Sequence, residues 1–366
     1  MKKFLLSLCM VLALTACKDE NKTNEQANVK PTIKIGAIFP LSGPQASMGE
    51  AAKAGMLKAL KEKNMSDLHY NYELVFEDNM GKIQVMPTAA TKLITQDKVD
   101  AISTITSAFA KVIAPLADQH NILLWDYSFE DKNYPRFGKY AFNQGVSVQD
   151  LADKFFSEFI MNDNIENVAV YVQNVGILGL LTNSLETKMQ QQGIKYVINA
   201  SNPGERDFRL SIAKNQENGF NKFLIMSFPP EREIILKQLL EAGVTKKDIY
   251  TGCLDMSPVI ELYEGIKTVT YGHGSQDFVD NLAKEYNLSS TFSATAFYDF
   301  VNLVIEASEN LYKKGEKPTA EQINNYILAK GKYPCASGEC DVKANGFILN
   351  QPISLICRDQ KWQEIQ

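Results

Sequence analysis

A hydroxyl group at the start of an expected helix is the clearest candidate for binding chemistry in this sequence. Thr106-Ser107-Ala108 follows a run rich in β-branched residues, 99–104, and precedes a helical pattern over 108–120. The first N–H groups of a helix have no intrahelical partner, and beside a serine hydroxyl they suit an anion. We therefore predict that Ser107 helps to bind an anion; the alternative is that it only caps its helix.

The sequence offers little support for catalysis or for a metal centre. Its three histidines are His69, His120 and His273, and none lies near a cysteine in the chain, which argues against a zinc site. It has no Gly-x-Ser-x-Gly elbow, no His-Glu-x-x-His and no Walker phosphate-binding loop. We therefore predict a protein that is not an enzyme and that uses no cofactor or metal.

The N-terminus, residues 1–16, has the pattern of a secretory signal peptide. Lys2 and Lys3 precede an apolar run that ends in Leu14-Thr15-Ala16-Cys17. This run is shorter than the roughly 20 residues that a membrane-spanning helix needs. The small residues before Cys17 resemble a bacterial lipobox, which implies cleavage after residue 16 and lipid on the Cys17 thiol. The chain would then be exported and anchored to the cell membrane, facing the periplasm or the cell exterior; the alternative is a chance cysteine.

The composition beyond the signal is that of a soluble globular protein. Residues 17–31 are polar and without periodicity, so they predict a flexible tether. The rest of the 366-residue chain is long enough for two domains. The net charge is −5 and no basic cluster occurs, so we predict no nucleic-acid partner.

Four cysteines remain once the signal and Cys17 are set aside: Cys253, Cys335, Cys340 and Cys357. In an exported protein they are candidates for disulfides. Cys335 could close a small loop with Cys340, or Cys340 could reach Cys357.

Short β-branched runs alternate with helical patterns along the body, which predicts right-handed βαβ crossovers and parallel sheets with helices on both faces. Strands are expected at 33–39, 72–77, 99–104, 122–125, 168–172, 195–199, 222–226 and 248–251. Helices are expected at 50–63, 85–97, 108–120, 148–161, 179–191, 208–216, 231–242, 294–313 and 320–328. Turn signals at Asn345-Gly346 and Asp359-Gln360 predict terminal hairpins.

The pattern restarts near 140–144, which indicates a second α/β unit of similar size. The fold class is therefore α/β, with two doubly wound, Rossmann-like lobes. Small ligands bind parallel sheets at the carboxyl ends of the strands. Two such edges that face one another would form a cleft.

The order of several short motifs resembles the solute-binding proteins of the Leu/Ile/Val-binding type, which have the type I periplasmic-binding fold. The opening resembles theirs from Ile35-Gly36-Ala37 through Leu41-Ser42-Gly43-Pro44 to Lys58-Ala59-Leu60. Further similar motifs are Glu77-Asp78-Asn79, Asp207-Phe208, 239–243 and Phe297-Tyr298-Asp299. The resemblance implies a three-segment hinge near 143–145, 272–275 and 350–352. Lobe 1 would comprise 32–143 plus 275–350, and lobe 2 would comprise 144–271 plus 353–366.

The resemblance also implies ligand-binding residues after the strand at 122–125. Ser107 falls where relatives bind a ligand carboxylate, and Ser128 and Glu130 where they hold α-amino and α-carboxylate groups. Relatives with amino-acid ligands tend to have a hydroxyl residue in place of Glu130, so a carboxylate in the cleft would repel an anion and favour a cation; alternatively, Glu130 points to solvent. Trp125 and Tyr127 could stack on a ligand or belong to the core.

Four other positions follow from the same resemblance. Phe228 would present an aromatic ring to the cleft, and Ile177 or a neighbouring residue takes the place of a tyrosine. Asp255 lies close to an acidic residue that pairs with a ligand ammonium group, and Met48 replaces a cleft aromatic. These differences make one side of the expected pocket more apolar and the other more acidic.

The function that the resemblance implies is capture of an amino acid or a related small polar solute for an ABC transporter. The expected partners are this ligand, the permease subunits, and the membrane through lipid on Cys17. The alternative is a lipid-anchored ligand sensor or a regulator of cell-wall synthesis on the same fold.

Overall fold

The computed structural model describes residues 30–252, 260–271, 274–291 and 293–365. The expected signal peptide, lipidation site Cys17 and most of the tether lie outside the described residues, as do Asp255 and Cys253. The described residues from Pro31 onward form one compact unit. None of the described helices has an apolar stretch long enough to cross a bilayer.

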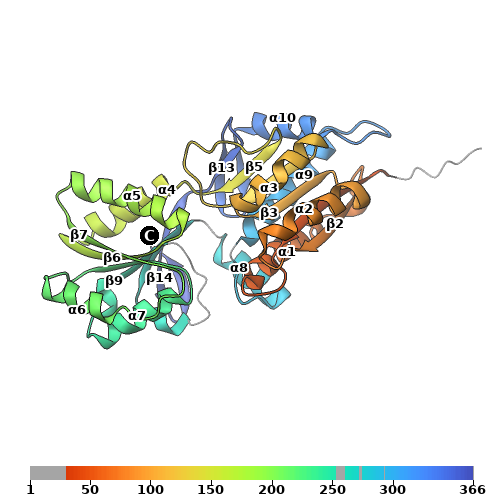
Figure 1. Cartoon of the computed structure of the whole chain (residues 1–366). Coiled ribbons are helices and arrows are strands. Elements are labelled where there is room, and N and C mark those ends of the chain that lie inside the picture. Colours follow the sequence, from red (N-terminus) through yellow and green to blue (C-terminus); the bar gives the residue numbers. More distant parts are fainter. Residues whose placement is uncertain (1–29, 253–259, 272–273, 292, 366) are drawn as a thin grey trace, which may run out of the picture. The chain divides into compact units, whose positions relative to one another are not determined.

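One mixed, mainly parallel sheet is built from the first part of the body and a later segment (Figure 1). Its strand order is β11-β12-β13-β5-β4-β3-β1-β2, and only the pairs β11/β12 and β12/β13 are antiparallel. The strands are β1 (Thr32–Phe39), β2 (Asn71–Asp78), β3 (Ala101–Ile105), β4 (Leu123–Tyr127), β5 (Ala141–Gly145), β11 (Lys332–Cys335), β12 (Gly338–Val342) and β13 (Phe347–Leu349).

A second mixed, mainly parallel sheet has the order β15-β14-β10-β9-β8-β6-β7. The strand β14 runs antiparallel to both of its neighbours. The strands are β6 (Asn167–Gln173), β7 (Lys195–Ser201), β8 (Phe223–Met226), β9 (Ile249–Gly252), β10 (Lys267–Tyr271), β14 (Pro352–Arg358) and β15 (Lys361–Glu364). The chain passes between the sheets after β5, β10 and β13. The lobe bounds stay a prediction, although β5 continues to Gly145, beyond the expected boundary at residue 143.

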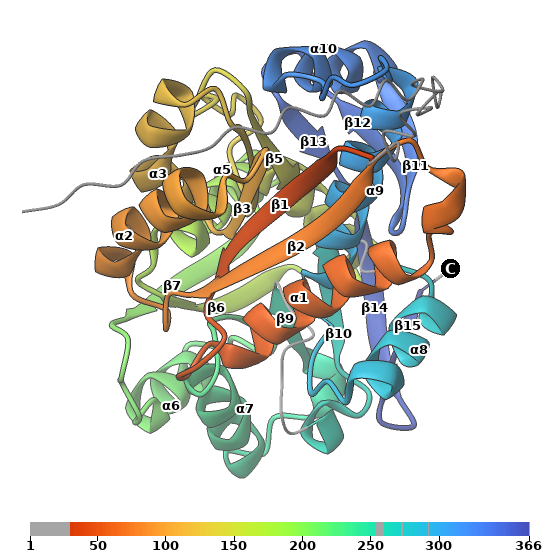
Figure 2. The ribbon, with the colours of Figure 1, turned by 90° about the vertical axis from the view of Figure 1, so that its right-hand side faces the viewer.

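Helices cover both faces of each sheet because strand residues alternate between two apolar clusters. In the first sheet, Ile35 packs with α1 and α9, whereas Ile38 packs with α2 and α3. Figure 2 shows α1 and α9 on one side of β1 and β2, with α2 and α3 on the other. In the second, Val170 packs with α4 and α5, and Tyr171 with α6 and α7. The helices are α1 (Ala46–Lys61), α2 (Met86–Thr91), α3 (Ser107–Gln119), α4 (Val148–Phe155), α5 (Gly176–Gln191), α6 (Arg209–Glu217), α7 (Glu231–Glu241), α8 (Gln276–Tyr286), α9 (Ala294–Asn310) and α10 (Ala320–Lys330).

The alternation of strands and helices therefore agrees with the predicted α/β class, and the hairpins β12–β13 and β14–β15 turn at the two expected sites. The strands and helices expected from the sequence did not include β5, β10 and α8. The apolar pattern of α8 is short, with Phe278, Leu282 and Tyr286 at its packed positions. Its start was nevertheless marked, since the Ser275 side chain accepts a hydrogen bond from the Phe278 N–H, as an N-cap does.

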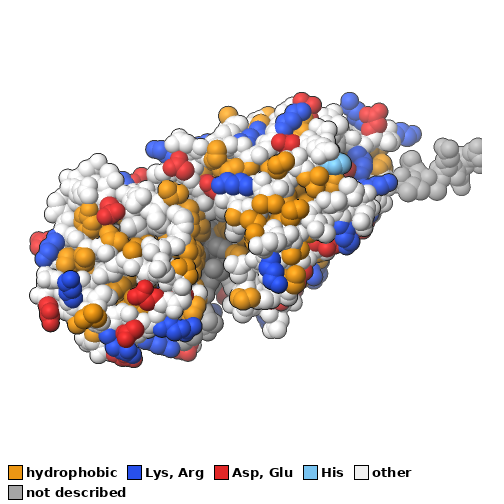
Figure 3. Space-filling view, viewed as in Figure 1, with side chains coloured by type: hydrophobic (Ala, Val, Ile, Leu, Met, Phe, Trp, Pro, Cys, Tyr) orange, Lys and Arg blue, Asp and Glu red, His pale blue; other side chains and the backbone are white. Residues whose placement is uncertain are grey.

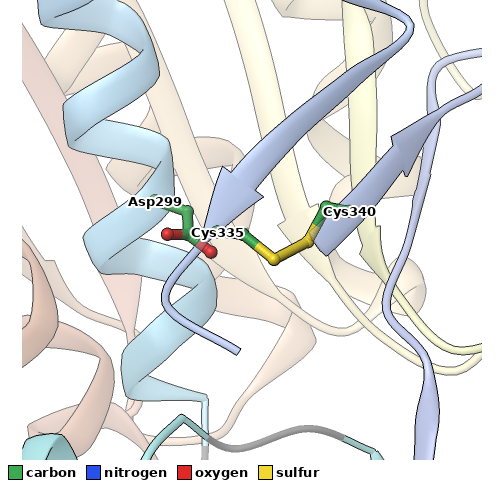
Figure 4. A group of neighbouring side chains, drawn as sticks. All are labelled: Asp299, Cys335 and Cys340. Carbon is green, nitrogen blue, oxygen red and sulfur yellow. A yellow bond between two sulfur atoms is a disulfide. The ribbon is translucent and has the colours of Figure 1, made fainter. Parts of the chain in front are cut away.

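The disulfide joins Cys335 and Cys340, one of the two pairings left open by the sequence (Figure 4). It closes the β11–β12 hairpin beside Asp299 of α9. Cys357 is a buried free thiol, and burial raises its pKa to about 11. On the face drawn in Figure 3, acidic and basic side chains are interspersed, in line with 43 acidic and 38 basic residues in the sequence.

Candidate ligand-binding site

A cavity of about 590 Å³ lies at the carboxyl ends of strands from both sheets. Its volume falls within the roughly 300–1,000 Å³ typical of small-molecule sites. Segments that follow β1, β3 and β4 form one side, segments that follow β6 and β8 form another, and the loop between α8 and α9 contributes two serines. The lining residues are Pro44, Gln45, Ser47, Met48, Ile105, Thr106, Ser107, Ala108, Tyr127, Ser128, Phe129, Val175, Ile177, Phe228, Pro229, Ser289 and Ser290.

The chemistry of this lining is apolar with several hydroxyl groups. No acidic, basic or histidine side chain is among the described residues that line the cavity. A charged ligand group in this part of the site would therefore be met by hydroxyls and backbone groups.

Ser107 lies at the first position of α3, on the cavity wall. The N-cap residue is Thr106, and no side chain makes a cap hydrogen bond there, so the alternative that Ser107 caps its helix is wrong. Within the described chain, the backbone N–H groups of Ser107 and Ala108 also have no hydrogen-bond partner. The helix start thus presents unpaired donors to the cavity, as the sequence led us to expect.

Thr106 adopts a backbone conformation that is rare for a residue with a side chain, with φ 73° and ψ 135°. Its N–H is fixed by a bond of 3.0 Å to the Tyr127 carbonyl oxygen, and its own carbonyl accepts from Phe109 and Ala110. Strained backbone of this kind costs on the order of 1–3 kcal/mol and is often found at ligand sites. Here the conformation lets the chain leave β3 and start α3 at the cavity.

Ser128 lines the cavity immediately after β4, and its hydroxyl belongs to a buried polar cluster. Ser128 Oγ donates to Asp126 Oδ2 at 3.0 Å and accepts from Asn143 Nδ2 at 2.6 Å. Burial raises the pKa of Asp126 to about 7, although hydrogen bonds from Asn143 and Ser128 act in the opposite direction. Asp126 and Asn143 were not singled out from the sequence.

Glu130 does not line the cavity, although the sequence placed it there as a candidate. Its backbone forms a bridge with Ser147, through bonds to Val146 O and Val148 N. The side chain is half-buried, with Oε1 3.5 Å from Ser128 Oγ. The Glu130 carboxylate therefore acts on a ligand in this cavity only from behind Ser128, which lines the cavity.

The aromatic residues that flank this loop divide between core and cavity. Trp125 is fully buried and packs on Phe142 and Phe300, so it belongs to the core. Tyr127 lines the cavity and packs edge-on against Phe297.

Three apolar candidates lie on the cavity wall. Ile177 is the second residue of α5, and Phe228 follows β8, where its N–H donates to Gln173 Oε1 at 3.2 Å. Met48 lies in the first turn of α1, and its carbonyl accepts from the Ser293 hydroxyl. The structure thus brings together Met48, Ser107, Ser128, Ile177 and Phe228; a ligand-binding role for each stays a prediction.

Several lining residues were missed. Phe129 lies between the two candidates of its loop and could have been found from them. With Val148, Leu151 and Phe228 it surrounds a gap that is too narrow for water. Ser289 and Ser290 come from the loop before α9, where the sequence has no distinguishing motif.

One cluster has the residue types of a metal site. Asp299, Cys335 and Cys340 place candidate ligand atoms within 4.8 Å of one another (Figure 4). Both sulfur atoms are joined in the disulfide, so they are not available as thiolate ligands.

Comparison with known proteins gives consistent matches over nearly the whole body. The profile of the family described as periplasmic binding protein matches residues 32–356. The chain is 20% identical over 345 residues to the Leu/Ile/Val-binding protein BraC3 of Rhizobium johnstonii, covering 90% of this chain and 92% of that protein.

Two solved structures show the same fold. The branched-chain amino acid transporter substrate-binding protein LivJ of Streptococcus pneumoniae, in complex with isoleucine, aligns with a TM-score of 0.74 and 20% identity, over 91% of this chain and 99% of that chain. A solute-binding protein of an ABC transporter from Rhodopseudomonas palustris, in complex with 3,4-dihydroxybenzoic acid, aligns with a TM-score of 0.74 and 19% identity, over 91% and 96%.

The fold is therefore the one expected from the sequence resemblance, and the match places the chain among proteins that bind solutes, in agreement with the prediction that it is not an enzyme. The chain belongs to the periplasmic binding protein family.

Proposed function

We propose that this protein captures an amino acid with an apolar side chain, outside the cytoplasm, for an ABC importer. The observation that carries the proposal is the start of α3, where the Ser107 hydroxyl and two unpaired N–H groups face a largely apolar cavity. A carboxylate fits the helix start, and an aliphatic side chain fits the wall formed by Met48, Ile177 and Phe228.

The names of the relatives support this ligand class without fixing the ligand. BraC3 is named for leucine, isoleucine and valine, and LivJ was solved with isoleucine. The Rhodopseudomonas protein holds 3,4-dihydroxybenzoic acid, which combines a carboxylate with an aromatic ring that carries two hydroxyl groups. An aromatic acid is therefore the main competitor.

Transport requires that the ligand favour one arrangement of the protein over another. A ligand that contacts both sides of the cavity stabilises the closed arrangement, and only such differential affinity shifts the equilibrium. The closed form would then dock on the permease.

A ligand screen tests the proposal directly. Thermal unfolding is measured with L-leucine, L-isoleucine, L-valine, benzoate and 3,4-dihydroxybenzoate, each at several concentrations. At about 100 times its dissociation constant, a true ligand adds about 2.7 kcal/mol to the free energy of unfolding. Stabilisation by an aliphatic amino acid supports the proposal, and stabilisation by the aromatic acids alone contradicts it.

We also propose that lipid on Cys17 holds the protein at the membrane. Support comes from the small residues before Cys17 and from the polar segment that follows it. Replacing Cys17 with serine should release the protein from the membrane fraction, whereas replacing Cys9 should not. Equal membrane association of both variants would contradict the anchor.

A further inference from the structure

The cluster behind Ser128 fixes the direction in which its hydroxyl group points. Asp126 and Ser128 lie two residues apart, so they share one face of the chain. Asn143 of β5 is the register partner of Asp126. Asp126 and Asn143 are fully buried, whereas Ser128 reaches the cavity.

The hydrogen bonds that Ser128 already makes determine what its hydroxyl can offer a ligand. The two N–H groups of the Asn143 amide are directed to Asp126 Oδ2 at 2.7 Å and to Ser128 Oγ at 2.6 Å. The opposite orientation of this amide would turn its oxygen toward the carboxylate and is therefore disfavoured. The only proton of the Ser128 hydroxyl is directed to Asp126 Oδ2 at 3.0 Å, and Glu130 Oε1 at 3.5 Å is the poorer acceptor. One lone pair of Ser128 then remains for the cavity.

Building on the proposed function, we infer that Asp126 is a positioning residue that makes Ser128 a hydrogen-bond acceptor toward the ligand. The ligand group beside Ser128 must then carry an N–H or O–H donor, and an ammonium group meets this requirement best because two carboxylates lie behind the hydroxyl. A ligand with a carboxylate alone would gain nothing from Ser128. The cluster thus distinguishes amino acids from plain acids.

The same geometry predicts a response to pH. Asp126 Oδ1 is buried and has no hydrogen-bond partner among the described residues, and burial raises the pKa of Asp126 to about 7. The titratable groups around it are Glu130, whose charge raises this pKa, Lys111 of α3, which lowers it, and the Tyr134 hydroxyl. A protonated Asp126 can donate to Ser128 Oγ, which frees the serine proton to point into the cavity. The preference for a donor group would then be lost below about pH 7.

Calorimetric binding of two matched probes to the full chain tests the inference. L-Leucine has an ammonium group that 4-methylpentanoate lacks. We expect wild-type protein to bind L-leucine more tightly than 4-methylpentanoate at pH 8. The ratio of the two affinities should fall roughly tenfold between pH 8 and pH 6. Asp126→Asn should reduce the preference at pH 8 by a similar factor and remove its pH dependence, whereas Asp118→Asn, at the far end of α3, should change neither. Equal affinity of wild-type protein for both probes would overturn the inference while leaving solute binding intact.

If neither probe binds, that result counts against the proposed ligand class. The inference about Asp126 and Ser128 can then be tested by a measurement that needs no ligand. The ¹³C-carboxyl resonance of Asp126 is titrated in wild-type protein and in Ser128→Ala. Loss of the serine donor should raise the midpoint of the Asp126 titration. An unchanged midpoint would show that the hydroxyl does not donate to this carboxylate, and the inference would fail.

Discussion

Gly145 and Ser128 approach each other so closely that a β-carbon on Gly145 would lie 1.9 Å from the Ser128 carbonyl oxygen. Gly145 ends β5, where the chain passes from the first sheet to the second, and Ser128 begins the loop that lines the cavity. The passage between sheets is therefore in direct contact with the backbone of the candidate site.

This contact predicts that Gly145→Ala impairs both stability and ligand binding. The new methyl group must displace a carbonyl group rather than a flexible side chain, and overpacking of this kind costs typically 1–3 kcal/mol. Urea unfolding and calorimetry would measure the two effects. Gly179→Ala is the matched control, because a β-carbon at this position of α5 meets nothing within 4 Å and alanine favours a helix. Equal behaviour of the two variants would contradict the prediction.

Ser107→Ala and Phe228→Ala should each weaken binding of an aliphatic amino acid by about tenfold or more, equal to about 1.4 kcal/mol. The Ser107 side chain makes no described hydrogen bond, so the melting temperature of the empty Ser107→Ala protein should change little, whereas Phe228→Ala also removes packing against the core and should lower it. Ser184→Ala and Leu210→Ala serve as controls, since Ser184 is half-buried, Leu210 is exposed, and neither residue lines the cavity. Affinities like that of wild-type protein would exclude both residues from the site.

Three of the candidate residues named from the sequence share one property. Ser107, Ser128 and Phe228 each lie just after a buried strand, and the βαβ pattern alone places such positions at one edge of a sheet. The alternation of apolar runs was also sufficient to identify most strands and helices. Those signals are local, so they could be read without knowing how the sheets are arranged.

The remaining parts of the site depend on contacts between residues that lie far apart in the sequence. Asp126 lies inside a strand whose five residues are all buried, so alternation could not mark it as functional. Its partner Asn143 is known only from the pairing of β4 with β5. The family resemblance implied a place in the pocket for Glu130, but its backbone bridges to Ser147 and the residue does not line the cavity. Pairing and register, rather than residue type, decided these cases.

The disulfide should contribute about 2 kcal/mol to the free energy of unfolding. This estimate follows from the loss of unfolded-chain entropy for cysteines five residues apart. The disulfide also holds the hairpin turn, where the Ala336 N–H donates to Asp299 Oδ1 at 2.8 Å. Reductant should lower the urea midpoint of wild-type protein but not that of Cys335→Ser/Cys340→Ser. A response of the double variant equal to that of wild-type protein would assign the effect to another pair, which peptide mapping would identify.

Asp299 should make the protein less stable as pH rises from about 4 to about 7. Burial raises its pKa to about 7, against hydrogen bonds from Gln144 and Ala336, whereas an unfolded aspartate has a pKa near 3.9. Between these values the folded state retains a proton that the unfolded chain has released. The free energy of unfolding therefore falls with pH, by at most about 1.4 kcal/mol per pH unit, and this contribution levels off above pH 7.

Urea unfolding of wild-type protein and Asp299→Asn at pH 5, 6, 7 and 8 measures this contribution. Asparagine removes the titration but keeps the size of the side chain, and the similarly buried Asp126 is present in both proteins, so the difference isolates Asp299. The stability of wild-type protein relative to the variant should decrease steadily from pH 5 to pH 7. A difference that stays constant over this range would mean that Asp299 ionises in the folded protein as it does in the unfolded chain, and Gln144 would then face a charged carboxylate at every pH tested.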